Sequence, residues 1–166
     1  VASMNPCPCG YLGDSSRPCR CTPGAVRRYL GRVSGPLLDR IDVQVRVGRP
    51  RFDELAGDAA GERSSLVAGR VLAARRVQYE RNGAGVTNAR IPAGSLRRTA
   101  GLAADALAIV KSAVETLGLS ARAYARILRI ARTIADLDGA EAVSAAHVRE
   151  AVQFRALDLE ARSFGE

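Results

Sequence analysis

The chain has 166 residues, of which 47% are hydrophobic and 25% charged, which is the balance of a globular protein rather than of a disordered or fibrous one. It contains no run of 18 apolar residues, so the sequence predicts no membrane span and no membrane partner. The net charge of +8 favours an anionic partner. Because aromatic residues make up only 4%, the core must consist of small aliphatic side chains.

Residues 1–4 are predicted to form the end of a strand, and residues 5–21 a loop that holds every cysteine of the chain. Two C-x-C pairs are separated by nine residues, and glycines and prolines between them allow the loop to fold back on itself. The four thiols are Cys7, Cys9, Cys19 and Cys21. Such a set suits a tetrahedral Zn²⁺ site, since zinc favours sulfur ligands and its filled d shell imposes no other geometry. The spacing is not that of the common C-x2-C pair, so disulfides or free thiols remain alternatives.

Positive charge concentrates in and after this loop. Nine arginines lie between Arg17 and Arg51, against only Asp39 and Asp42. Four zinc-bound thiolates would return about two negative charges to this region. A basic stretch of this kind fits a nucleic-acid surface, but such a patch is more often a solvated face.

The middle of the chain predicts two short helices, a strand and a linker. Thr22 followed by Pro23 is a helix start, with the helix continuing to about Leu30. A helical turn follows at 34–38. Residues 41–47 alternate between apolar and polar side chains, which predicts a strand with one buried face. Residues 49–63 lack periodicity and are interpreted as a linker.

The second half predicts a helical bundle with short connections. Serines are expected to cap three of its helices, at Ser64 or Ser65, at Ser120 and at Ser144. The predicted helices span about 64–81, 95–99, 102–117, 120–137 and 144–159. The fold class is therefore mainly α, with a small α/β segment and a cysteine-rich loop ahead of the bundle.

Four stretches in this order resemble the ComM/YifB branch of the magnesium-chelatase-like AAA+ ATPases. They read NPCPCG at 5–10, SGPLLDRID at 34–42, LSARAY at 119–124 and ARTIADL at 131–137. The resemblance implies that residues 1–48 are the C-terminal end of an ATPase core. Residues 64–166 would then be a helical lid of the magnesium-chelatase C-terminal type.

The resemblance also implies a longer protein. Such ATPases bind nucleotide with a G-x-x-x-x-G-K-[ST] loop, which this sequence lacks. We therefore expect the missing N-terminal part to bind ATP and Mg²⁺, and the full-length protein to form a cytoplasmic homo-oligomer with six subunits. The chain alone is expected not to hydrolyse ATP.

Three residues match catalytic positions of the family. Asn5 resembles the sensor-1 residue that orients the attacking water, although an Asn in such a turn is ordinarily a turn former. Arg40 resembles the arginine finger that reaches a neighbouring subunit's nucleotide, and its alternative is a salt bridge to Asp39 or Asp42. Arg122 resembles the sensor-2 arginine that touches nucleotide phosphate, and it lies in the first turn of a helix, where the dipole favours an anion.

Other polar residues of the bundle are given structural interpretations. We expect Arg126 and Arg129 to form a solvated basic face, and His147 to be a surface or packing residue without partners. Tyr124, Thr133 and Asp136 belong to the family pattern and are expected to hold the bundle together.

The resemblance leaves three functions open. The first is a DNA motor for branch migration in recombination and natural transformation. The second is a chelatase-type remodelling ATPase subunit, although the cysteine signature argues against it. The third is a zinc-stabilised module that binds DNA without ATP.

Overall fold

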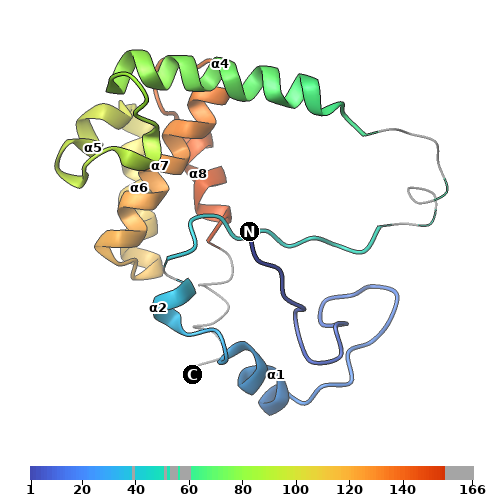
Figure 1. The fold of residues 1–166 in the computed structure, drawn as a ribbon. Coiled ribbons are helices and arrows are strands. Elements are labelled where there is room, and N and C mark those ends of the chain that lie inside the picture. The colour runs from blue at the N-terminus through green and yellow to red at the C-terminus, as the bar shows by residue number, and fades with distance from the viewer. Residues whose placement is uncertain (39, 51, 53–55, 57–60, 156–166) are drawn as a thin grey trace. The chain divides into compact units, whose positions relative to one another are not determined.

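The computed structural model describes residues 1–38, 40–50, 52, 56 and 61–155 (Figure 1). They fall into two compact units, which we call unit 1 (within 1–59) and unit 2 (within 60–155) and describe separately. The regular elements among the described residues are helices, with no β-strand. The prediction of a mainly helical chain with a cysteine cluster near its N-terminus is confirmed.

Unit 1 consists of the cysteine loop followed by two short helices. Helix α1 spans Pro23–Leu30, and its predicted cap is present, since the Thr22 hydroxyl accepts a hydrogen bond from the Ala25 N–H at 3.2 Å. Proline at the first helical position leaves no N–H unsatisfied there. Helix α2 spans Gly35–Leu38, as the predicted helical turn requires.

The predicted strands are wrong for the described residues. Residues 1–4 and 41–47 belong to no sheet. Val43, Val45 and Val47, the side chains expected to be buried, are 47%, 61% and 91% exposed. A β-strand forms only when its backbone pairs with a neighbouring strand, and the described residues offer this segment no partner strand. The valine side chains of this segment therefore stay exposed, because no sheet forms that would bury them. Most of the predicted linker lies outside the described residues.

Unit 2 is built from five α-helices and one 3₁₀ turn. Their bounds are α4 Ser64–Asn82, η1 Asn88–Arg90, α5 Ala93–Ala100, α6 Ala104–Leu117, α7 Ala121–Leu137 and α8 Ala145–Gln153. Ser120 and Ser144 occupy the predicted N-cap positions. At α4 the cap prediction is wrong, because Arg63 takes the N-cap position without a side-chain bond and Ser64 is already helical. Gly118 ends α6 at φ 54°, a left-handed conformation that glycine adopts without strain.

Helix α7 lies at the centre of unit 2 and packs against α4, α5 and α8, while α6 packs against α8. Its inward face is apolar and small, with Ile127, Leu128, Ala131 and Ala135 at most 1% exposed. Alanines at the crossing points let helix backbones approach closely, which is how a chain with few aromatic residues fills its core. The result is one core shared by α5, α6, α7 and α8.

Candidate functional site

The four cysteines lie together in unit 1 with their sulfur atoms within 4.8 Å of one another. The Sγ–Sγ distances are 3.4 Å for Cys7 and Cys9, 3.7 Å for Cys7 and Cys19, and 3.6 Å for Cys9 and Cys19. A tetrahedron with Zn–S bonds of about 2.3 Å has edges of about 3.8 Å. A disulfide needs an S–S distance of about 2.05 Å. All four cysteines are free thiols in the structure. The four sulfur positions therefore fit the donor set of a metal site better than two disulfides.

Local turns bring the two C-x-C pairs together. Gly10, at φ 80°, donates its N–H to the Cys7 carbonyl at 3.0 Å and closes the first turn. The Asp14 carboxylate accepts the Ser16 N–H at 2.7 Å and the Ser16 hydroxyl at 2.6 Å, which shapes the return of the loop. In the second pair, the Cys19 sulfur accepts the backbone N–H two residues on at 3.4 Å.

The four thiols differ in pKa, because backbone N–H groups lower some of these values while burial and neighbouring thiols raise others. Hydrogen bonds from the N–H groups of Tyr11 and Arg20 lower the pKa of Cys9 to about 6. The Cys9 N–H also lowers the pKa of Cys21, but the surrounding thiols and burial outweigh it and raise that pKa to about 12. Such a split is expected when neighbouring groups cannot all become anionic together. A bound divalent cation offsets the repulsion between the thiolates, so all four can be anionic together. The donor set therefore fits Zn²⁺.

The predicted catalytic residues are distributed over both units. In unit 1, Asn5 is exposed, and its amide lies beside Gly10, where an added Cβ would be 3.9 Å from the Asn5 Cγ. Arg40 is exposed just after α2 and donates to the Pro36 carbonyl at 3.0 Å. Arg122 is exposed in unit 2, within the first turn of α7. Each of the three is accessible to a ligand of its own unit.

The start of α7 is built to hold Arg122 in place. The Ser120 hydroxyl accepts the Ala123 N–H at 3.1 Å, and the Ser120 carbonyl accepts the Tyr124 N–H at 2.9 Å. These bonds fix the first turn of the helix. Arg122 therefore belongs to a fixed first turn, at the positive end of the helix dipole.

A buried ionic network in unit 2 was only partly anticipated. The Asp136 carboxylate has no exposed surface and receives both Nη atoms of Arg81 at 2.7 Å, the Asn88 amide at 2.8 Å and the Arg132 Nε at 3.0 Å. These bonds join α4, η1 and α7, so Asp136 holds the bundle together as expected. Thr133 does so too, accepting the Asn88 amide at 3.0 Å. The i,i+4 spacing of Arg132 and Asp136 was the one sequence signal for this network.

Two interpretations of the bundle require correction. Arg129 is half-buried rather than solvated, because its Nη2 donates to the Ile91 carbonyl at 2.8 Å. His147 packs as predicted but has partners: its Nδ1 accepts the Ser144 N–H at 3.0 Å, and its Nε2 lies 3.2 Å from Asp138. With Nδ1 as acceptor, the proton of the neutral ring is on Nε2, facing the carboxylate.

Within the described residues, every helix is too short or too polar to cross a lipid bilayer.

Comparison with known proteins gives one consistent result. Residues 61–155 match the family described as magnesium chelatase, subunit ChlI C-terminal, and residues 1–55 match magnesium chelatase, subunit ChlI. The chain is 41% identical over 160 residues both to the uncharacterized protein YifB of Salmonella typhimurium and to the competence protein ComM of Haemophilus influenzae. An uncharacterized protein of Mycobacterium tuberculosis is 37% identical over 157 residues.

These alignments cover 95%, 95% and 93% of the chain but only 31%, 30% and 31% of the three relatives, so the chain spans under a third of their length. The matched family regions together cover the cysteine loop and the helical bundle. The chain therefore belongs to the magnesium-chelatase-like family of AAA+ ATPases, in the branch that contains YifB and ComM.

Proposed function

We propose that this chain is the C-terminal part of a ring-forming AAA+ ATPase that drives branch migration of DNA during recombination and natural transformation. The observation that carries the proposal is the 41% identity to a competence protein across 95% of the chain. Competence is the ability to take up DNA, which makes DNA the substrate to test first. The basic charge of unit 1 agrees with this choice.

Within that protein, residues 1–48 would complete the ATPase core, and residues 64–166 would form the lid. Asn5 would orient the attacking water. Arg40 would act as the arginine finger on the nucleotide of a neighbouring subunit in the ring. Arg122 would bind a nucleotide phosphate and report its state to the lid. The exposure of both arginines supports these roles, since a planar permanent cation stabilises charge on a transferring phosphoryl group.

The four cysteines would hold one Zn²⁺ ion with a structural role. Zinc bound there cross-links the loop and ties it to α1, because Cys21 directly precedes the N-cap residue Thr22. Four protein ligands leave no open position for a substrate, which is typical of structural zinc sites. The metal would stabilise the fold around Asn5 and take no part in hydrolysis.

The test is ATP hydrolysis by the full-length protein, with and without branched DNA. We expect DNA to stimulate hydrolysis, and Arg40→Ala to lower the stimulated rate by about 10³-fold or more. Arg40→Lys, which keeps the charge but not the planar fork, should recover little. Arg63→Ala removes a cation from an exposed position outside the proposed site and serves as the matched control.

Mixed rings separate a finger acting between subunits from a local structural role. Arg40→Ala subunits are combined with subunits that carry an inactivating change in the nucleotide loop. Because each partner supplies what the other lacks, mixing should restore part of the activity. A mixture as inactive as its components would contradict the finger assignment.

The name of the matched family favours one other candidate, a chelatase-type remodelling subunit that acts on a protein partner. Hydrolysis that is indifferent to DNA, yet abolished by Arg40→Ala, would support that function instead.

The metal assignment has its own measurement. We expect about one Zn²⁺ per chain, lost in a Cys19→Ser variant, and a sulfur-ligated absorption band when Co²⁺ is substituted. Chelation should abolish amide dispersion for residues 5–30 and leave the resonances of unit 2 unchanged, because unit 2 has a hydrophobic core of its own. Loop resonances unchanged after metal removal would overturn the assignment.

A further inference from the structure

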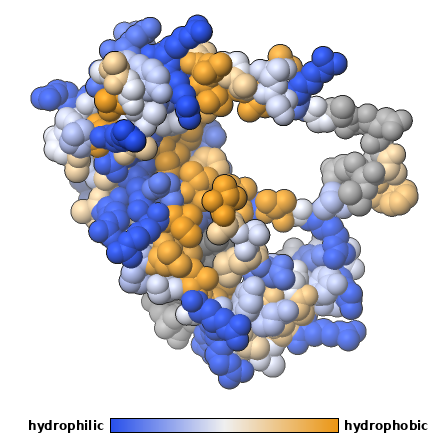
Figure 2. Space-filling view, viewed as in Figure 1, coloured by the Kyte–Doolittle hydropathy of each residue, from blue (hydrophilic) through white to orange (hydrophobic). Residues whose placement is uncertain are grey.

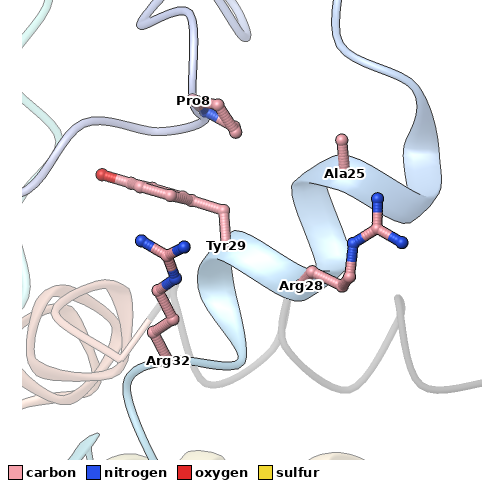
Figure 3. A pocket seen from close by; sticks show the side chains of 5 residues that line it. All are labelled: Pro8, Ala25, Arg28, Tyr29 and Arg32. Atoms are coloured by element: carbon pink, nitrogen blue, oxygen red, sulfur yellow. The ribbon is translucent and has the colours of Figure 1, made fainter.

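A pocket of about 460 Å³ lies within unit 1 between the cysteine loop and α1 (Figure 3). Its volume falls in the range of small-ligand sites, about 300–1,000 Å³. Five residues line it: Pro8, Ala25, Arg28, Tyr29 and Arg32. The last four recur at helical spacing, so one face of α1 and the turn after it forms one wall, and the loop supplies the other.

The pocket carries positive charge that no described residue neutralises. Arg28 and Arg32 are exposed, and neither guanidinium has a hydrogen-bond or ion-pair partner among the residues that the structure describes. Figure 2 shows strongly hydrophilic residues gathered over α1. Residues 1–38 contain five arginines and one acidic residue, Asp14, which Arg49 already contacts at 3.6 Å. Even after the two negative charges of a metal-bound four-thiolate cluster, this segment remains cationic.

The pocket also contains a flat aromatic surface. Tyr29 is half-buried, and in the view of Figure 3 its ring lies between Pro8 and Arg32, with Arg28 nearer to Ala25. An aromatic ring beside exposed guanidinium groups is an arrangement that binds single-stranded nucleic acid, in which a base stacks on the ring and phosphates contact the arginines.

We infer that this pocket binds single-stranded DNA, with a base stacked on Tyr29 against Pro8 and flanking phosphates held by Arg28 and Arg32. The inference rests on the proposed DNA-motor function and names the surface that would grip the strand. A single strand fits better than a duplex, because only unpaired bases can turn out of the stack into a pocket. Pro8 lies between two of the sulfur ligands, so the cysteine cluster positions one wall of the site.

The experiment measures binding of the 166-residue chain to labelled oligonucleotides by fluorescence anisotropy. The probes are an oligothymidine of about 20 nucleotides, an abasic strand of the same length and charge, and a duplex. The variants are Arg28→Ala/Arg32→Ala, Tyr29→Leu and Tyr29→Phe. Arg97→Ala/Arg98→Ala is the matched control, since it removes two exposed arginines from the last turn of α5.

We expect Arg28→Ala/Arg32→Ala to weaken oligothymidine binding by about 10-fold or more. It should also lower the slope of log affinity against log salt by about 1.4, about 0.7 for each lost phosphate contact. Tyr29→Leu should weaken oligothymidine binding about 5-fold or more and leave abasic-strand binding unchanged, because the abasic strand has no base to stack. Tyr29→Phe, which keeps the ring, should bind as the wild type does.

The outcomes separate the pocket from the proposed function. Equal weakening by the pocket and control arginine pairs, or a Tyr29→Leu effect of the same size on the abasic strand, overturns the pocket alone. Failure of the wild-type chain to bind any strand also overturns it. The proposed DNA-motor function is tested separately, by ATP hydrolysis of the full-length protein. Hydrolysis that DNA does not stimulate would contradict that function. Circular dichroism and thermal melting of each variant show whether a loss of binding reflects unfolding.

Discussion

Asp136 shows how a single side chain can organise unit 2. Its carboxylate is fully buried, and burial by itself raises its pKa, because the charged form loses its hydration. Hydrogen bonds from Arg81 and Asn88 and the charge of Arg132 outweigh burial, so the pKa of Asp136 lies below its ordinary value. Burial likewise lowers the pKa of Arg132, and the carboxylate opposes that effect. The Arg132 guanidinium therefore depends on Asp136 for its counter-charge.

We therefore predict that Asp136→Ala lowers the free energy of unfolding by about 3–5 kcal/mol, because it leaves the Arg132 guanidinium buried without a counter-charge. Urea denaturation followed by circular dichroism measures the change. Glu115→Ala breaks the exposed pair with Lys111, which is 3.8 Å long, and should have a far smaller effect. Losses of equal size in the two variants would contradict a network role for Asp136.

The same carboxylate predicts a sensitivity to acid. A carboxyl group whose pKa is lowered on folding contributes its full stability above its unfolded pKa, about 3.9, and loses it as the pH falls through the lower folded-state value. The wild type should therefore lose stability as the pH falls from about 5 through the lowered folded-state pKa of Asp136. Asp136→Asn, which cannot titrate at this position, should show a shallower decline. Denaturation midpoints across this range, parallel for both proteins, would disprove the assignment.

At the scale of elements, α7 connects the core to the proposed phosphate-binding arginine. Its inward face supplies Ile127, Leu128 and Ala131 to the core, while its first turn presents Arg122 to solvent. The Ser120 cap is therefore the local contact on which both stability and the position of Arg122 depend.

We predict that Ser120→Ala destabilises unit 2 by about 1 kcal/mol, since the Ala123 N–H loses its acceptor. Ser120→Asp should keep the cap and serve as the rescuing variant. In the full-length ATPase, Ser120→Ala should also raise the KM for ATP, because a frayed first turn no longer fixes Arg122. Thermal unfolding and steady-state kinetics measure the two effects, and an unchanged melting temperature would show that the cap is not needed.

At the scale of the whole molecule, the two units differ in what holds them together. Unit 2 has a core of thirteen buried apolar residues, whereas in unit 1 the described buried apolar residues are Cys7 and Val26. A segment with so little buried apolar surface depends on cross-links, here the proposed zinc site.

Hydrogen exchange should reflect this difference. We predict slow amide exchange in α5, α6, α7 and α8, and fast exchange throughout unit 1 once the metal has been removed. Mass spectrometry of the chain with and without a chelator measures both units in one sample. Equal protection of the two units in the chelated protein would show that unit 1 has a core of its own.

Much of this organisation follows from short-range patterns. The Thr22, Ser120 and Ser144 caps and the glycine at the end of α6 are local rules of backbone hydrogen bonding, and the structure confirms them. The clustering of the cysteines within fifteen residues required only that their loop close, so their meeting was also predictable. The roles of Asn5, Arg40 and Arg122 stay predictions, since they depend on a bound nucleotide.

Other features depended on contacts between residues distant in the sequence. Alternation at 41–47 predicts a strand only if a partner strand pairs with it, and none lies among the described residues. Arg129 lies on the same helix face as Arg122 and Arg126, which predicts a solvated side chain. It is half-buried instead, and it donates to the carbonyl of Ile91, 38 residues away in the sequence. The Asp136 network joins residues up to 55 positions apart. Local sequence patterns thus predicted the helices of unit 2, three of the helix caps and the meeting of the four cysteines, because those depend on near neighbours. Packing alone decided which charges are buried, because burial is a property of the assembled bundle.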